Sequence, residues 1–244
     1  MSSLTKVQAI EKVLQENGGS ANWQVIYDNI EKYYPNAKKS KDWEAGLRGV
    51  LYREIRQNTK RFKKIGLSIY ALYDYNEEKQ PEINDVKRMH SYIEGICLEL
   101  GNLQKFETFT ADPSAFYRDN LSLKNFATLD ELPQFSYKDI LDDVKRIDVI
   151  WFNSIGLKFP QKVFEIVDSI GTLTGAFNRS LQLKNFITDF YIVAPEKHRE
   201  KYKQTINLEI YKPNKSRFKF INYNEIIAYY NTLLQTKKIE SSIF

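Results

Sequence analysis

The segment from Val144 to Phe186 places two acidic residues within or beside short apolar runs. Asp148 stands directly before the run 149–152, and Glu165 lies inside the run 163–167. A loop containing glycine and proline separates the runs, which predicts two β-strands joined by a longer connection than a tight hairpin. Acids on two paired strands can hold one divalent cation, because Mg²⁺ requires oxygen ligands. The segment therefore predicts metal-assisted phosphodiester chemistry.

The first 75 residues show three helical patterns followed by a short hairpin. Apolar residues recur at helical spacing in 4–16, 23–30 and 43–55. The following stretch, RFKKIGLSIYAL, contains two short strand-like runs around Gly66. This order is typical of a winged helix-turn-helix, in which the third helix enters the major groove of DNA and the wing contacts the backbone.

Positive charge is concentrated in this N-terminal region. The whole chain carries a formal charge of +5, whereas residues 38–64 contain ten basic and three acidic residues, a net charge of +7. Such a patch predicts a polyanionic partner, and the alternative is a solvated helix face. The residues that we predict to contact double-stranded DNA are Lys38, Lys39, Lys41, Arg48, Arg53, Arg56, Lys60, Arg61, Lys63 and Lys64.

The remainder of the chain alternates between helical and strand-like patterns. A polar stretch at 75–85 is typical of a linker, and a helix that follows it should end at Gly101. Further strands are expected at 106–110, 190–194, 208–211 and 218–222, and helices at 139–145, 172–186, 197–204 and 226–234, the last followed by a loose tail. Residues 112–138 have little periodicity and predict a long functional insertion.

These patterns resemble the PD-(D/E)XK nucleases, which carry an acid on one strand, an acid on the next and then a helix. The stretches RIDVIWF, FPQKVFEIVDS, NRSLQLKNF and FYIVAP resemble restriction-endonuclease-like proteins with an N-terminal HARE-type winged helix. The likeness to HARE domains rests on LTKVQAIEKVL, WEAGLRGVLYREIR and the wing. The resemblance covers nearly the whole chain. It implies an α+β protein with a winged helix-turn-helix at 1–75, a linker at 76–85 and a PD-(D/E)XK restriction-endonuclease-like α/β domain at 86–244.

The resemblance also implies the metal ligands. Asp148 and Glu165 would bind Mg²⁺, and Glu94 matches the glutamate that the first helix of such enzymes often contributes. The alternative for the first two is a pair of ordinary acids at strand ends, salt-bridged to Lys145 or Arg146. The alternative for Glu94 is a surface glutamate.

The third element of the motif departs from the pattern. The family places a lysine two residues after the second acid, and this chain has Val167 there. Valine can neither accept a proton nor bind a metal. Asp168 follows but points to the opposite face of a regular strand, unless a bulge returns it. The role can instead have moved to Lys162 or to Arg179, which matches a recurring arginine of the family. The candidate catalytic residues are thus Asp148, Glu165, Glu94, Lys162 and Arg179.

Other chemistries find less support in the sequence. The two histidines, His90 and His198, lie in polar helical contexts and are expected to be exposed. Cys97 is the single cysteine, so there is no internal disulfide or cysteine-built zinc site. The glycines form no phosphate-binding loop, which excludes a nucleotide cofactor. We expect no membrane segment, no signal peptide at the N-terminus and a cytoplasmic location.

Three functions remain open on the sequence alone. The first is a type II restriction endonuclease that cuts double-stranded DNA with Mg²⁺. Cutting both strands usually requires two active sites, so a homodimer is expected, with residues 112–138 and the closing helix as candidate interfaces. The second is a catalytically inactive DNA-binding protein or regulator on a decayed nuclease core, which Val167 favours. The third is a protein-interaction module, for which DNA binding would be weak or absent.

Overall fold

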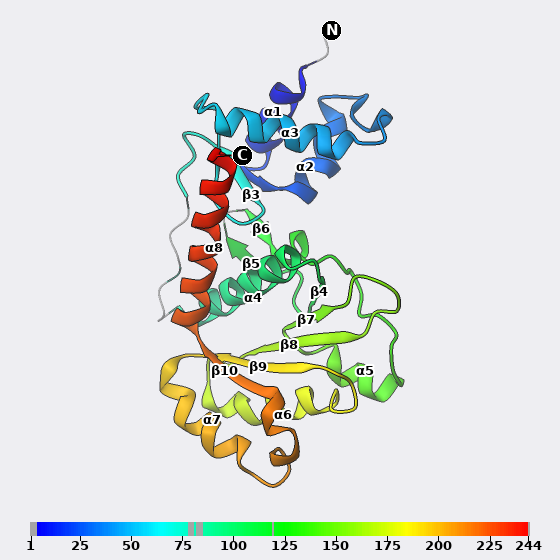
Figure 1. Ribbon diagram of the computed structural model, residues 1–244, viewed down its shortest axis with the longest axis vertical. Coiled ribbons are helices and arrows are strands. Elements are labelled where there is room, and N and C mark those ends of the chain that lie inside the picture. The colour runs from blue at the N-terminus through cyan, green and yellow to red at the C-terminus, as the bar shows by residue number, and fades with distance from the viewer. Residues whose placement is uncertain (1–3, 78–80, 82–84, 119, 244) are drawn as a thin grey trace. The chain divides into compact units, whose positions relative to one another are not determined.

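In the computed structural model the chain forms two compact units, and the structure describes residues 4–77, 81, 85–118 and 120–243 (Figure 1). The first unit comprises the described residues within Met1–Gln80, Arg118–Leu121 and Asn231–Phe244. The second comprises those within Pro81–Tyr117 and Ser122–Tyr230. The structure is mixed α+β, as the sequence predicted. Most of the expected linker, at 78–80 and 82–84, lies outside the described residues.

The first unit combines three helices with a small antiparallel sheet. Its elements are α1 (Lys6–Glu16), β1 (Ser20–Asn22), α2 (Trp23–Asn29), α3 (Trp43–Arg56), β2 (Phe62–Lys64) and β3 (Ile69–Leu72). The strand order is β1-β3-β2. Thr5 and Gln8 form a capping box at the start of α1, and Gly18 and Gly19 adopt positive φ after it. The expected helices and hairpin are therefore present.

The second unit is built on a five-stranded sheet of order β10-β9-β8-β7-β4. Its elements are α4 (Val86–Leu103), β4 (Glu107–Thr110), α5 (Lys138–Val144), β7 (Val149–Phe152), β8 (Pro160–Ile166), α6 (Leu173–Leu181), β9 (Asp189–Ala194), α7 (Arg199–Ile206) and β10 (Phe218–Asn222). Three further elements, β5 (Phe116–Arg118), β6 (Leu121–Ser122) and α8 (Tyr223–Ile243), contribute residues to both units. Strands β8, β9 and β10 are parallel, whereas β7 runs antiparallel to both its neighbours. The predicted pairing of the two apolar runs is confirmed as β7 and β8.

The sheet is covered on both faces, which explains why its central strands are apolar almost throughout. Helix α4 lies on one face, and α6 and α7 lie on the other (Figure 1). Phe177 of α6 and Tyr202 of α7 pack with Phe190 of β9 in the main hydrophobic cluster. On the opposite face, Trp151 of β7 donates a hydrogen bond to the carbonyl of Cys97 in α4, at 3.1 Å.

Four expectations from the sequence are wrong. The helix expected at 172–186 ends at Leu181, and residues 182–185 form turns. Helix α4 does not end at Gly101 but continues to Leu103. The glycine is explained by packing instead, since a Cβ at this position would lie 2.7 Å from Nε1 of Trp151. Residues 208–211 form turns rather than a strand, and Tyr211 joins the cluster under the sheet. The closing helix α8 begins at Tyr223 and extends to Ile243, so the expected loose tail is helical.

Candidate metal centre

Four acidic side chains converge at one end of the sheet from separate elements. Glu94 lies in the middle of α4, and Asp148 directly precedes β7. Asp168 follows β8 by two residues, and Asp112 follows β4 by two residues. Glu94 is close enough to the other three for their charges to raise its pKa. Mutual repulsion makes such a group costly unless a cation is bound among its members.

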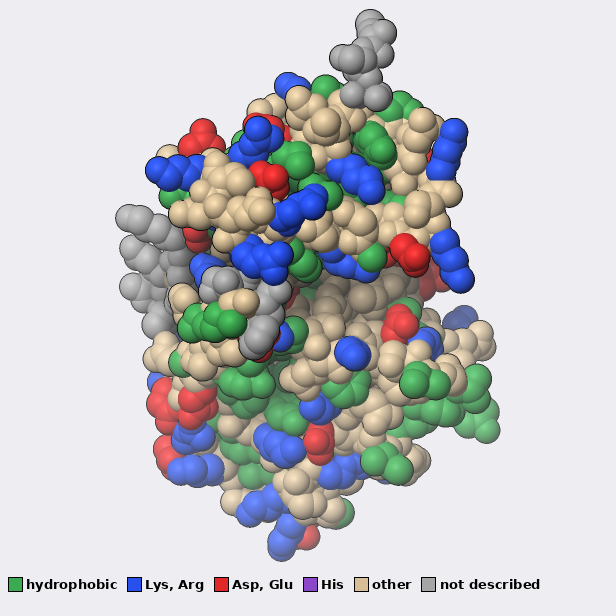
Figure 2. Space-filling model, turned by 45° about the horizontal axis from the view of Figure 1, so that its top comes forward, with side chains coloured by type: hydrophobic (Ala, Val, Ile, Leu, Met, Phe, Trp, Pro, Cys, Tyr) green, Lys and Arg blue, Asp and Glu red, His purple; other side chains and the backbone are tan. Residues whose placement is uncertain are grey.

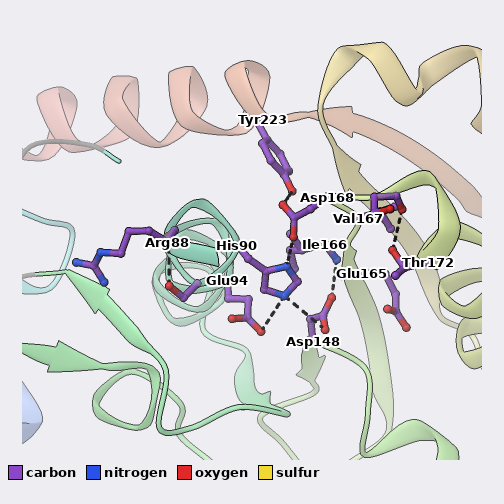
Figure 3. A network of polar contacts seen from close by, with 12 residues as sticks. Arg88, His90, Glu94, Asp148, Glu165, Ile166, Val167, Asp168, Thr172 and Tyr223 are labelled. Carbon is purple, nitrogen blue, oxygen red and sulfur yellow. Dashed lines mark hydrogen bonds and ion pairs between the residues drawn. The ribbon is translucent and has the colours of Figure 1, made fainter. Parts of the chain in front are cut away.

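His90 lies at the centre of this group, one helical turn before Glu94 (Figure 3). Its Nδ1 is 2.6 Å from Oδ2 of Asp168. Its Nε2 is 3.8 Å from Oε1 of Glu94 and 3.9 Å from Oδ1 of Asp148. One ligand atom from each of His90, Glu94 and Asp148 lies within 4.8 Å of the others, an arrangement that can hold a metal ion.

Backbone and side-chain donors fix two of the acids. The backbone N–H of Ile166 donates to Oδ2 of Asp148 at 2.6 Å, which leaves Oδ1 directed at His90. The hydroxyl of Tyr223, at the start of α8, donates to Oδ1 of Asp168 at 2.6 Å. A chain of contacts thus runs from Tyr223 through Asp168 and His90 to the two inner acids (Figure 3).

Burial dominates the electrostatics of the group. It raises the pKa of Glu94 well above the usual value, and it raises the pKa of Asp148. Burial by itself lowers the pKa of His90, but the hydrogen bond with Asp168 and the negative charges of Glu94 and Asp148 outweigh it and raise that pKa to about 9. A positive charge is therefore strongly favoured between these acids.

The second predicted metal ligand, Glu165, has a different partner. Its side chain is fully buried and points toward α6, where Nε of Arg179 donates to Oε1 at 2.8 Å and the Nη2 group donates to Oε2. Such a bidentate pair satisfies both carboxylate oxygens. Burial raises the pKa of Glu165, and the hydrogen bond with Arg179 opposes that shift. The structure therefore groups Asp148 with Glu94 and pairs Glu165 with Arg179, and Asp148 lies close enough to Glu165 for its charge to raise the pKa of Glu165.

The remaining candidates for the third catalytic group lie apart from the acids. Lys162 points to the face of β8 opposite Glu165, where its Nζ lies 5.2 Å from the ring centre of Phe106 and 5.1 Å from that of Trp151. Val167 is buried in the main hydrophobic cluster. The alternative that Lys145 and Arg146 pair with Asp148 is wrong, because the two instead contact Asp142 and Asp143.

Sequence reasoning did not identify His90 as part of the site. The expectation that both histidines are exposed is wrong: His90 is half-buried among acids, and His198 is only 5% exposed. A usable signal was present, because residues 90 and 94 are spaced by four and therefore lie on the same side of a helix. Glu94 is also not the surface residue of the alternative interpretation, since it is 2% exposed.

The cluster opens into a cleft of about 770 Å³. Helix α4 supplies one wall with His90 and Glu94, and its first turn adds the basic residues Lys87 and Arg88. The exposed ring of Phe116 lies in the same lining. A polyanionic ligand entering the cleft would thus meet cationic side chains beside the acidic group.

The ten predicted DNA-contacting residues all belong to the first unit but come from several elements. Arg53 and Arg56 lie on the side of α3 opposite its buried residues, since successive residues turn by about 100°. Arg48 donates to the hydroxyl of Tyr27 at 2.6 Å. Figure 2 shows basic side chains distributed over this unit, with acidic ones among them. The other members are Lys38 and Lys39 in a short 3₁₀ helix, Lys41 before α3, Lys60 and Arg61 after it, and Lys63 and Lys64 in β2.

A comparison with protein families assigns this chain to the restriction-enzyme class. The model of the type II restriction enzyme NmeDI C-terminal domain matches residues 73–243. The chain belongs to this family and is a restriction-enzyme-like protein. Comparisons with curated proteins and with solved structures found no match. Within the described part of the chain, no helix has both the length and the apolar composition to cross a bilayer.

Proposed function

We propose that this chain is a type II restriction endonuclease that hydrolyses double-stranded DNA with a divalent metal ion, Mg²⁺ being the ion that the family resemblance predicts. The observation that carries the proposal is the convergence of Glu94 and Asp148 within the family domain, beside a cleft that Glu94 helps to line. Carboxylate oxygens are the ligands that Mg²⁺ prefers. Asp148 and Glu165 remain the predicted pair of the motif, and the contacts favour Glu94 over Glu165 as the partner of Asp148.

The element order supports a PD-(D/E)XK assignment for the second unit. An acid before β7, an acid on the adjacent β8 and a following helix α6 agree with the order of that core. Three helices and a three-stranded antiparallel sheet likewise support a winged helix of the HARE type in the first unit. We propose domains at 1–75 and 86–244, joined by a linker at 76–85.

The residues of the cluster and of the neighbouring helix α6 would have different roles in the reaction. A divalent ion held at the cluster supplies positive charge that polarises the scissile phosphate and activates a water. Asp148, oriented by the backbone N–H of Ile166, and the buried Glu94 would hold that ion. Val167 is uncharged and cannot transfer a proton. Another side chain must therefore stabilise the negative charge that develops on the phosphate. Arg179 is the best-placed predicted cation, since its charge influences the pKa of both Asp148 and Glu165.

Recognition would rest on the first unit. A winged helix uses its third helix and its wing, and α3 and β2 carry five of the ten predicted contacts. We propose that the protein acts as a homodimer in the cytoplasm, with residues 112–138 and α8 as candidate interfaces. The alternative function, a DNA-binding regulator on an inactive nuclease core, is favoured by Val167 and by the Glu165–Arg179 pair.

DNA cleavage tests the proposal. The protein is incubated with methylated and unmethylated plasmid and genomic DNA, in Mg²⁺ or EDTA, beside Asp148→Asn and the exposed control Asp139→Asn. We expect discrete Mg²⁺-dependent fragments from the parent and the control. Loss of a charged ligand worth about 3 kcal/mol should slow Asp148→Asn by at least roughly 100-fold. Salt-sensitive DNA binding without cleavage of any substrate would instead establish the inactive alternative.

A further inference from the structure

We propose that one divalent ion is bound by Nε2 of His90 together with Glu94 and Asp148, and that Asp168 holds the His90 ring in place. The nitrogen ligand would make the site bind transition-metal ions such as Mn²⁺ more tightly than Mg²⁺. This inference rests on the proposed function and adds to it a ligand that is neither a carboxylate nor on the sheet.

The spacing of the ligand atoms fits an ion rather than direct contact. Nε2 of His90 is 3.8 Å from Glu94 and 3.9 Å from Asp148, beyond hydrogen-bond length. Two ligands that each lie about 2.0–2.2 Å from one ion are roughly 3–4 Å apart. The three side chains therefore surround a space of the size that an ion fills, and Figure 3 shows them pointing toward one another.

The Glu94 carboxylate provides an independent indication of a ligand. This residue is 2% exposed, and its carboxylate accepts no hydrogen bond from any residue in the described part of the chain. A buried carboxylate without such partners is costly. Its side chain points into the cluster, toward His90 (Figure 3). A bound cation removes that cost, which the charge of His90 at 3.8 Å offsets only in part.

The environment of His90 matches that of a metal-binding histidine. In such residues the ring N–H that does not face the metal usually donates a hydrogen bond to a carboxylate. This bond fixes the ring and makes the metal-facing nitrogen a better ligand. Here Asp168 lies 2.6 Å from Nδ1, and Tyr223 in turn fixes Asp168. Nε2 is thereby directed at the two inner acids. Imidazole suits transition metals, whereas Mg²⁺ favours oxygen ligands alone.

Direct spectroscopy on the whole protein tests this inference without relying on activity. Mn²⁺ is added as the probe, its affinity is measured from the electron paramagnetic resonance signal of the free ion, and pulsed measurements detect nitrogen bound to it. We expect one tight Mn²⁺ site with a coordinated nitrogen, displaced by Mg²⁺ only at much higher concentration. Absence of nitrogen coupling in the parent protein would overturn the proposal, and this measurement needs no variant to fold.

Three variants sharpen the result. His90→Gln should weaken Mn²⁺ binding and abolish the nitrogen coupling. Asp168→Asn should weaken binding by about 10–100-fold, as outer partners of metal ligands usually do, and the exposed control Asp139→Asn should change nothing. Mn²⁺ binding that stays equal or becomes tighter in His90→Gln would mean that His90 serves as an internal cation, which overturns the proposal. Thermal unfolding verifies that each variant is folded.

The parallel cleavage assay separates this inference from the proposed function. Nitrogen-coordinated Mn²⁺ in a protein that cuts no DNA would uphold the metal ligands and reject the nuclease. Cleavage that requires Asp148, in a protein whose Mn²⁺ affinity is indifferent to His90, would uphold the nuclease and reject His90 as a ligand.

Discussion

The Glu165–Arg179 pair allows a quantitative test of how this site is stabilised. The Glu165 side chain is 0% exposed and that of Arg179 is 28% exposed. Arg179→Met removes the guanidinium but keeps most of the side-chain length. The carboxylate then loses both hydrogen bonds while it remains buried beneath α6.

The expected loss of stability is large. Removing one partner of a buried ion pair typically costs about 3–5 kcal/mol, because the remaining charge is uncompensated. For a protein of this size each kcal/mol lowers the melting temperature by about 2–4 °C. Arg179→Met should therefore melt roughly 6–20 °C below the parent. Protonation of Glu165 in the variant would remove its uncompensated charge and so reduce the loss of stability. The decrease in melting temperature should then lie toward the smaller end of this range.

The loss of stability in Arg179→Met should also depend on pH, and it should grow as pH rises. Burial raises the pKa of Glu165, and Arg179 lowers it, so the pKa in the variant lies higher than in the parent. A carboxyl whose folded-state pKa is raised contributes stability that is present in acid and lost as pH rises through that pKa. The difference between variant and parent should thus be smallest near about pH 5 and widen as pH rises through the Glu165 pKa of the parent.

Denaturant unfolding at several pH values provides the assay. Arg146→Met is the matched control, because Arg146 pairs with Asp143 at the surface and is 64% exposed. The free energy of unfolding of that control should fall by less than about 1 kcal/mol. Replacing both Glu165 and Arg179 by methionine should recover most of the stability lost in the single variant. A free energy of unfolding for Arg179→Met within about 1 kcal/mol of the parent would refute the reasoning.

Two further predictions concern packing and DNA binding. Gly101→Val should destabilise the protein by about 1–3 kcal/mol, because a Cβ there would lie 2.6 Å from Thr108 and 2.7 Å from Trp151; thermal unfolding measures it, and an unchanged melting temperature would contradict the close packing. Arg53→Ala combined with Arg56→Ala should weaken DNA binding on all sequences and reduce the salt dependence of log K by about 1 for each lost phosphate contact. Fluorescence anisotropy over a range of salt concentrations measures that slope.

Lys203→Ala is the control for the DNA experiment, since Lys203 is an exposed basic residue of α7 in the second unit. It removes one positive charge, whereas the α3 variant removes two, and it leaves the first unit unchanged. An equal loss of affinity per charge removed in this control and in the α3 variant would indicate that binding follows net charge rather than the helix that we predict to enter the groove.

Local sequence patterns were sufficient for much of the fold. The apolar runs around Asp148 and Glu165 predicted β7 and β8, because a strand covered on both faces is apolar almost throughout. Helical spacing similarly predicted α1, α2 and α3. Errors occurred where a residue type reflects tertiary packing rather than local structure: Gly101 lies within α4, and the close approach of Trp151 explains the glycine there.

The partners of the site residues were decided only by the tertiary structure. Glu165 alternates in phase with Val163, so the pleat of β8 directs it to α6 and Arg179. Asp168 follows the end of that strand, where alternation no longer applies, and it reaches His90, which lies 78 residues earlier in the chain. The sequence by itself identified Asp148 and Glu94 as candidate metal ligands. Only the packing of α4 against the sheet decided that a histidine lies among the acids, because no local pattern links residues so distant in the chain.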